Sequence, residues 1–163
     1  AEATAAADGL EGVLRYDPMS MRPFMSYGEG DYAAHWLEVI GRATKKPIFA
    51  HVNWFQRGED GRFLWPGYRE NLRPLVWLMQ YREGEVTGRE TPVGVVPLRE
   101  ELLLEGLDEQ ALADLDTVLE IDVDRWKEEM GHREKHLDQF PGLPEEIWDA
   151  HRRVAKALES FEG

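Results

Sequence analysis

The sequence of 163 residues contains no cysteine. Disulfides, thiolate nucleophiles and zinc sites with cysteine ligands are therefore excluded, and a reducing cytoplasmic location is expected. Long apolar runs are also missing, since no stretch approaches the roughly 20 residues that a membrane helix needs. We therefore expect no membrane partner. The sequence begins with Ala rather than Met and shows no signal peptide, so we expect a fragment of a longer chain.

Basic residues are scarce in the second half of the chain, and the net charge is −13. Residues 1–80 carry nine Arg and Lys against ten Asp and Glu, whereas residues 81–163 carry ten against twenty-two. An acidic surface repels phosphate backbones, which makes nucleic acid an unexpected partner. The nearly neutral first half is the part suited to a small polyanion.

The order of the predicted elements indicates an α/β fold with a mostly helical, acidic tail. A segment rich in small residues (2–12) precedes a helix that begins near Asp31 and ends at Gly41. Residues 48–65 predict an aromatic β-hairpin, and a second helix begins near Asn71. Amphipathic helices are expected at 108–119, 122–140 and 144–161. We divide the chain into a nucleotide-side segment (1–97) and an acidic helical lobe (98–163).

The predicted hairpin is unusually rich in aromatic residues. Phe55 and Phe63 flank the turn QRGEDGR on opposite arms, where their side chains can share one face. Two rings with a gap between them can stack on a planar base, and the amide of Asn71 offers a donor and an acceptor at its edge. The alternative is that the rings are ordinary core residues, since aromatic side chains in hairpins mostly pack inward.

Other patterns associated with catalysis are missing from the sequence. There is no G-x-x-x-x-G-K-[ST] loop for phosphates. His132 and His136 are spaced i, i+4, but they lie in a charge-rich stretch typical of a solvated helix face. We therefore expect neither metal ligands nor catalytic residues in this segment.

A resemblance favours the ligand interpretation of the aromatic residues. The segments EATAAADG, DPMSMRPF, GDYAAHWL, VNWF, GRFLWPGYREN and TPVGVVP occur in this order. In order and approximate spacing, the chain from Glu2 to about Gly106 resembles the C-terminal part of GTP-dependent phosphoenolpyruvate carboxykinase. The acidic tail is similar to this family only in its helical character.

The resemblance implies a guanine pocket in the hairpin region (48–71). Phe55 and Phe63 would stack on the base with Trp54 behind them, and Asn71 would form hydrogen bonds with the base edge. Tyr68 stands where the family has Phe, and Arg69 replaces a glycine. The resemblance also implies that residues 3–12 form a mobile lid over the active site. We assign the lid to Ala3, Thr4, Ala5, Ala6, Ala7 and Asp8.

The family activity that the resemblance implies is that of a decarboxylating lyase of gluconeogenesis. The intact enzyme would convert oxaloacetate and GTP to phosphoenolpyruvate, GDP and CO2, with Mn²⁺ and Mg²⁺ held by ligands upstream of this chain. We expect a monomer. Two alternatives remain open, namely a non-catalytic guanine-nucleotide-binding module and a helical protein-interaction domain.

Overall fold

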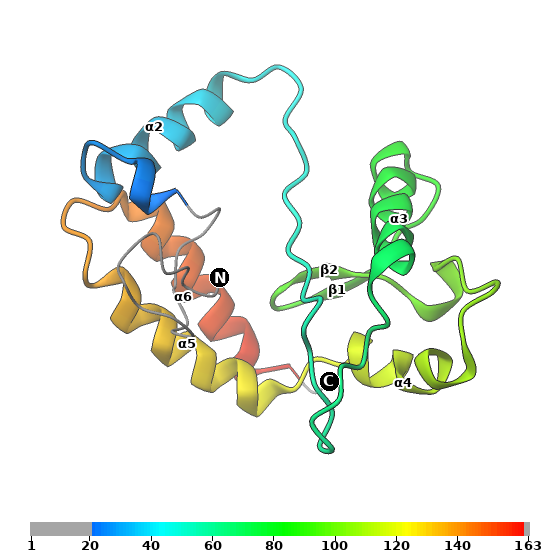
Figure 1. The fold of residues 1–163 in the computed structure, drawn as a ribbon. Helices are drawn as coiled ribbons and strands as arrows, with labels where there is room; N and C mark the ends of the chain where they lie inside the picture. Colours follow the sequence, from blue (N-terminus) through cyan, green and yellow to red (C-terminus); the bar gives the residue numbers. More distant parts are fainter. Residues whose placement is uncertain (1–20, 162–163) are drawn as a thin grey trace. The chain divides into compact units, whose positions relative to one another are not determined.

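The computed structural model describes residues 21–161 of the chain (Figure 1). Contacts within the chain define two compact units, which are considered separately. The first comprises residues 1–46 and 127–156, and the second comprises residues 47–126 and 157–163. The predicted lid lies outside the described residues.

The described part of the first unit is built from helices. It contains the short 3₁₀ helix η2 (Arg22–Phe24) and the helix α2 (Glu29–Arg42), together with most of α5 (Val123–Leu137) and α6 (Glu145–Glu159). Helix α2 confirms the predicted helix, but Gly28 rather than Asp31 is its N-cap residue. Asp31 instead lies in the first turn, where its charge is favourable to the helix dipole.

Glycine at position 30 is required by a close approach within this unit. A Cβ added to Gly30 would lie 2.6 Å from the carbonyl carbon and oxygen of Gly142 and 2.7 Å from the carbonyl oxygen of Pro141. Helix α2 therefore packs directly on the loop between α5 and α6, and any side chain at position 30 would force the two apart.

Helix α6 confirms the apolar stripe predicted from the sequence. Leu158 is fully buried, His151 is 6% exposed, and Ile147 and Val154 are partly buried along the same face, whereas Phe161 lies beyond the end of the helix at Glu159. Their spacing of three or four residues places them on one side of the helix.

The second unit combines short helices with one small sheet. Its elements are η3 (Tyr68–Asn71), α3 (Leu72–Glu83), β1 (Arg89–Thr91), β2 (Gly94–Val96), η4 (Arg99–Glu101) and α4 (Glu109–Leu119). Strands β1 and β2 are antiparallel, with Glu90 opposite Val95. Helices α3 and α4 begin and end within a few residues of the predicted positions. The described residues are thus mostly helical with a single two-stranded hairpin, so the α/β prediction is correct only in part.

The β-hairpin predicted at residues 48–65 is wrong as a pair of strands. An isolated antiparallel bridge joins Arg57 and Phe63 there, with hydrogen bonds from the N–H of Gly58 to the carbonyl of Arg62 and from the N–H of Leu64 to the carbonyl of Gln56, but the segment forms no strand. The side chain of Asn53 accepts a hydrogen bond from the N–H of Phe55, which turns the incoming arm away from extended pairing.

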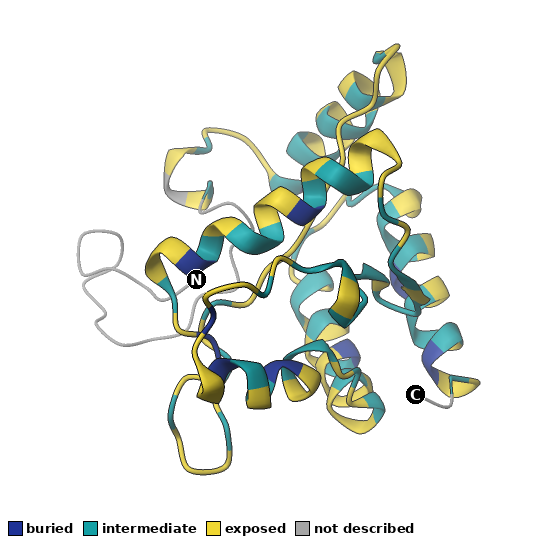
Figure 2. Ribbon diagram, turned by 90° about the vertical axis from the view of Figure 1, so that its right-hand side faces the viewer, coloured by how far each residue is buried: buried dark blue, intermediate teal, exposed yellow. Residues whose placement is uncertain are grey.

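Two apolar surfaces of the second unit face solvent. Residues 47–53 form an extended segment in which every residue is exposed (Figure 2). Within residues 21–161 no strand pairs with this segment, although it contains Ile48, Phe49 and Val52. On α3, exposed apolar side chains recur at helical spacing, namely Leu72, Leu75, Val76 and Met79. Contiguous exposed apolar side chains of this kind are typical of surfaces that contact other protein.

None of the helices in the described region is both long and apolar enough to cross a membrane.

Candidate nucleotide site

The rings of Phe55 and Phe63 contact each other from the two arms of the bridged turn. Their centroids lie 5.9 Å apart with an angle of 63° between the ring planes, an edge-to-face arrangement. A base between two parallel rings needs a separation of roughly 7 Å, twice the carbon–carbon contact distance. The two rings are too close together, and too far from parallel, for a base to lie between them, so the expected gap is absent. Phe55 is 72% exposed and Phe63 46%, so both offer ring surface to a ligand.

A cation lies on one of these rings. The guanidinium carbon of Arg57 is 3.9 Å from the centroid of the Phe63 ring, and Nη1 of the same residue donates to the carbonyl of Gly61 at 2.5 Å. This cation–π contact fixes the orientation of Phe63 and places a positive charge beside the aromatic pair.

Asn71 has a structural partner. Nε1 of Trp65 donates a hydrogen bond to Oδ1 of Asn71 at 2.9 Å, and Trp65 is buried. The contact fixes the Asn71 amide at the start of α3 and leaves its NH₂ group as the donor suited to a ligand. Trp54 is partly buried.

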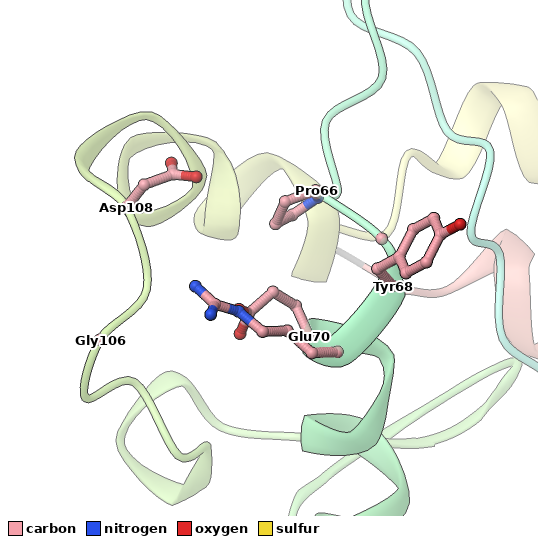
Figure 3. A pocket seen from close by; sticks show the side chains of 7 residues that line it. Pro66, Tyr68, Glu70, Gly106 and Asp108 are labelled. Atoms are coloured by element: carbon pink, nitrogen blue, oxygen red, sulfur yellow. The ribbon is translucent and has the colours of Figure 1, made fainter.

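A pocket of about 310 Å³ is formed in part by residues 66–70, which lie between Trp65 and Asn71 in the sequence. It is lined by Pro66, Gly67, Tyr68, Arg69, Glu70, Gly106 and Asp108 (Figure 3). Among the predicted site residues only Tyr68 lines it, whereas Trp54, Phe55, Phe63 and Asn71 do not. Its volume is at the lower end of the range for small-molecule sites, which begins at about 300 Å³.

The backbone at the pocket is strained in a way that exposes an aromatic ring. Tyr68 has φ +52°, within residues 21–161 the only non-glycine residue with positive φ, and its side chain is 96% exposed. Gly67 precedes it at φ +79°. Left-handed backbone is costly for a residue with a Cβ, and such strain is concentrated at functional sites.

Ion pairs hold the floor of the pocket. Glu70 is buried and pairs with Nε of Arg73 at 2.5 Å and with Nε of Arg69 at 2.7 Å. These two guanidinium groups, Arg73 first, lower the pKa of Glu70 below its usual value despite the opposing effect of desolvation. Glu70 is therefore ionised at neutral pH and fixes Arg69 at the edge of the pocket.

Arg73 also positions the opposite wall. Its Nη1 donates to the carbonyl of Leu103, and its Nη2 donates to the carbonyl of Glu105 at 3.0 Å. The loop that carries Gly106 and Asp108 is thereby tied to the start of α3.

The sequence did not predict the residues of this wall. Asp108 is the N-cap of α4, since its Oδ1 accepts from the N–H of Ala111 at 2.7 Å. An N-cap is a local signal for a helix start, and it carries no information about a pocket formed with residues 40 positions earlier.

The described residues contain no group of three or more His, Asp or Glu side chains that could hold a metal ion. Nδ1 of His132 lies 3.6 Å from Glu129, and the ring of His136 packs edge-on against Phe140. No step through a divalent metal is therefore assigned to the described residues.

Comparison with known proteins identifies the family. The profile of the phosphoenolpyruvate carboxykinase C-terminal P-loop domain matches residues 1–157. The chain belongs to this family. The resemblance seen in the sequence motifs is thereby confirmed.

Individual carboxykinases are similar over nearly the whole chain. The GTP-dependent phosphoenolpyruvate carboxykinase of Corynebacterium kroppenstedtii is 41% identical over 150 residues, which cover 91% of this chain and 24% of that protein. The enzymes of Thermoplasma volcanium and Renibacterium salmoninarum are 42% and 43% identical, and each alignment covers 90% of this chain and 24% of the relative. The chain therefore spans about a quarter of the length of these carboxykinases.

Proposed function

We propose that this chain is the guanine-nucleotide-binding and lid segment of a GTP-dependent phosphoenolpyruvate carboxykinase. In the intact enzyme, oxaloacetate loses CO2 and the oxygen of the resulting enolate accepts the γ-phosphoryl group of GTP, which yields phosphoenolpyruvate and GDP. Residues 1–97 form the nucleotide side and residues 98–163 the acidic helical lobe. Mn²⁺ and Mg²⁺, when bound, neutralise charge on the transferred phosphoryl group. The residues that hold these metal ions lie outside this chain. The intact enzyme is a cytoplasmic monomer.

The observation that carries the proposal is the exposed aromatic surface of the unit that also contains a pocket of about 310 Å³. Phe55, Phe63 and Tyr68 present ring surface to solvent within one unit of the chain. Burying exposed aromatic rings against a base contributes about 1–3 kcal/mol per contact. Tyr68 lines the pocket at the cost of backbone strain, which supports a role in binding rather than in packing.

The exposed apolar surfaces support a role within a longer protein. The unpaired extended segment 47–53 and the apolar stripe on α3 are suited to contact with further protein. The carboxykinases that match this chain are about four times as long. A catalytic role of the segment therefore requires the remaining part of such an enzyme.

The lid proposal rests on chemistry. Closure over the active site would keep water from the enolate, which water would otherwise protonate. The small side chains from Ala3 to Ala7 bury little surface, so the open state costs little free energy. Asp8 would latch the closed lid to a basic group outside this chain.

A calorimetric titration of the chain with GDP and with ADP tests the nucleotide site. We expect binding of GDP and a loss of about tenfold or more in affinity on Phe63→Ala, with an unchanged circular dichroism spectrum. Phe24→Ala is the matched control, because Phe24 is an exposed phenylalanine of the other unit. If Phe63→Ala unfolds the chain, the ring is core. If it leaves GDP affinity unchanged, the stacking role is wrong.

A further inference from the structure

The aromatic turn (residues 55–63) carries Phe55 and Phe63 on a short length of bridged backbone. Directly after it the chain enters the core, since Leu64 and Trp65 are buried. The two phenylalanine rings are exposed, so burial in the core does not set their orientation. Because ordering a loop on binding costs affinity, the affinity of such a turn for a ligand depends on the contacts that order it beforehand.

An ion pair joins the aromatic turn to helix α4, 52 residues later in the sequence. Nη1 of Arg62 donates to Oδ2 of Asp114 at 2.5 Å, and Nη2 donates to Oδ1 of the same carboxylate at 2.7 Å. Nε of Arg62 lies 3.0 Å from Oδ2 of Asp60, within the turn. All three nitrogens of the guanidinium thus have a carboxylate partner, which fixes the plane of the group.

Asp114 belongs to a well-packed helix. Its side chain is 12% exposed, and the neighbouring residues Ala111 and Leu115 of α4 are part of the core. The hydrogen bonds from Arg62 lower the pKa of the Asp114 carboxyl below its usual value, against the opposing effect of desolvation. Helix α4 therefore presents a fixed, ionised carboxylate to the turn at neutral pH.

Arg62 and Phe63 are consecutive residues with different partners. The ring of Phe63 contacts the ring of Phe55 and the guanidinium of Arg57. Consecutive side chains of extended backbone point to opposite sides, and Phe63 takes part in the bridge. The pairing of Arg62 with Asp114 therefore also determines the side to which the ring of Phe63 points.

We propose that Asp114 is a positioning residue for nucleotide binding, which through Arg62 holds the ring of Phe63 in the orientation that stacks on the base. The inference rests on the proposed function and extends it to a residue of the acidic helical lobe. Because a carboxylate repels the phosphates of a nucleotide, Asp114 acts through Arg62 and not by contact with the ligand. It orders the turn in the free chain, so less entropy is lost on binding.

A double-mutant cycle measured by calorimetry with GDP tests the inference. Asp114→Asn and Arg62→Gln each remove one charge of the pair, and each should weaken GDP binding about fivefold. The double variant should lose no more than either single variant, because both substitutions remove the same contact. Losses that multiply in the double variant would show that the two residues act separately, and the inference would be wrong.

Hydrogen exchange of the nucleotide-free chain separates positioning from general stability. Asp114→Asn should speed exchange of the amides of Gly58 and Leu64, which are hydrogen-bonded across the turn. The amide of Leu115, within α4, should keep its protection. An equal loss of protection in the turn and in the helix would assign Asp114 to the stability of the unit alone and overturn its role in positioning.

Asp116→Asn is the matched control. Asp116 also lies on α4, and its Oδ1 pairs with Nη1 of Arg99 at 2.8 Å, outside the aromatic turn. This variant should leave both GDP affinity and exchange of the turn unchanged. A loss equal to that of Asp114→Asn would contradict a specific role of Asp114. Arg62 is 39% exposed, so Arg62→Gln carries the test alone if Asp114→Asn does not fold.

The outcomes separate the two proposals. A wild-type chain that binds GDP, with single variants that bind it as tightly, overturns the positioning inference and leaves the proposed function standing. A wild-type chain that does not bind GDP overturns both, whatever the exchange of the turn.

Discussion

The indole of Trp65 and the amide of Asn71 are joined by a hydrogen bond of 2.9 Å that spans the turn carrying Tyr68. Because the indole N–H can only donate, the Asn71 oxygen is its acceptor. The two residues hold the ends of the strained segment 66–70 together. Asn71 thus has a structural role in addition to the proposed contact with the base.

Two substitutions of Asn71 separate these roles. Asn71→Ala leaves the Trp65 N–H without its partner and should lower the free energy of unfolding by about 1–3 kcal/mol. Asn71→Asp keeps the acceptor and should lower it by less. Both variants lack the amide NH₂ group, so both should lose preference for GDP over ADP. Urea unfolding and calorimetry measure the two effects, and a preference that survives Asn71→Ala contradicts the contact with the base.

We predict that the backbone of Tyr68 lowers the free energy of unfolding, whereas its ring contributes to GDP binding. Tyr68→Gly relieves the left-handed backbone at φ +52° and should raise the free energy of unfolding by up to about 1 kcal/mol, while it weakens GDP binding. Tyr68→Ala removes the ring but keeps a Cβ, so it should weaken GDP binding without a gain in stability. Greater stability of the alanine variant would show that the ring, and not the backbone, is the source of strain.

Elements that depend on residues close together in the sequence were predicted correctly, whereas features that depend on residues far apart in the sequence were not. Helix α6 was predicted because its buried residues repeat locally every three or four positions. Strands did not form at 48–65 because residues with high β-propensity need a neighbouring strand to pair with. In this segment the single bridge is between Arg57 and Phe63. The pocket wall at Gly106 and Asp108 was missed because it depends on Arg73, which binds backbone carbonyls 30 residues away. No local pattern encodes such a contact.

Glu101 connects three segments of the second unit. Its carboxylate accepts from Nε1 of Trp77 at 2.9 Å and from the N–H groups of Thr87 at 2.9 Å and Gly88 at 3.0 Å. Desolvation opposes ionisation, but these donors, with the N–H of Leu98, lower its pKa from 4.5 to about 2. The folded state therefore prefers the ionised carboxylate more strongly than the unfolded state does.

A pH dependence follows from this shift. Because the pKa is lower in the folded state, the stabilisation by Glu101 is complete above about pH 4.5 and is lost as the pH falls to about 2. Glu101→Gln should lower Tm at pH 7 and flatten the fall in Tm between pH 4.5 and 2. Glu100→Gln, at the exposed neighbouring position, is the control and should keep the fall. An unchanged acid transition in Glu101→Gln would exclude this carboxylate as its cause.

His151 is a buried titratable group of the first unit with no hydrogen bond at Nδ1 among the described residues. Its ring meets Trp148 edge-on at 6.1 Å between centroids. Desolvation, followed by the charges of Arg133 and Arg152, lowers its pKa below 6.5, and the charge of Glu134 only partly opposes this. The folded state therefore favours neutral imidazole.

Acidification should thus destabilise the packing around His151. The unfolded chain takes up a proton near pH 6.5 and the folded chain only at lower pH, so stability is complete above about pH 6.5 and falls below it. His151→Leu cannot be protonated and should flatten the fall in Tm between pH 7 and 5. His132→Leu, on the exposed part of α5, is the matched control and should keep the fall. If both variants lose stability on acidification as the wild type does, another group is responsible.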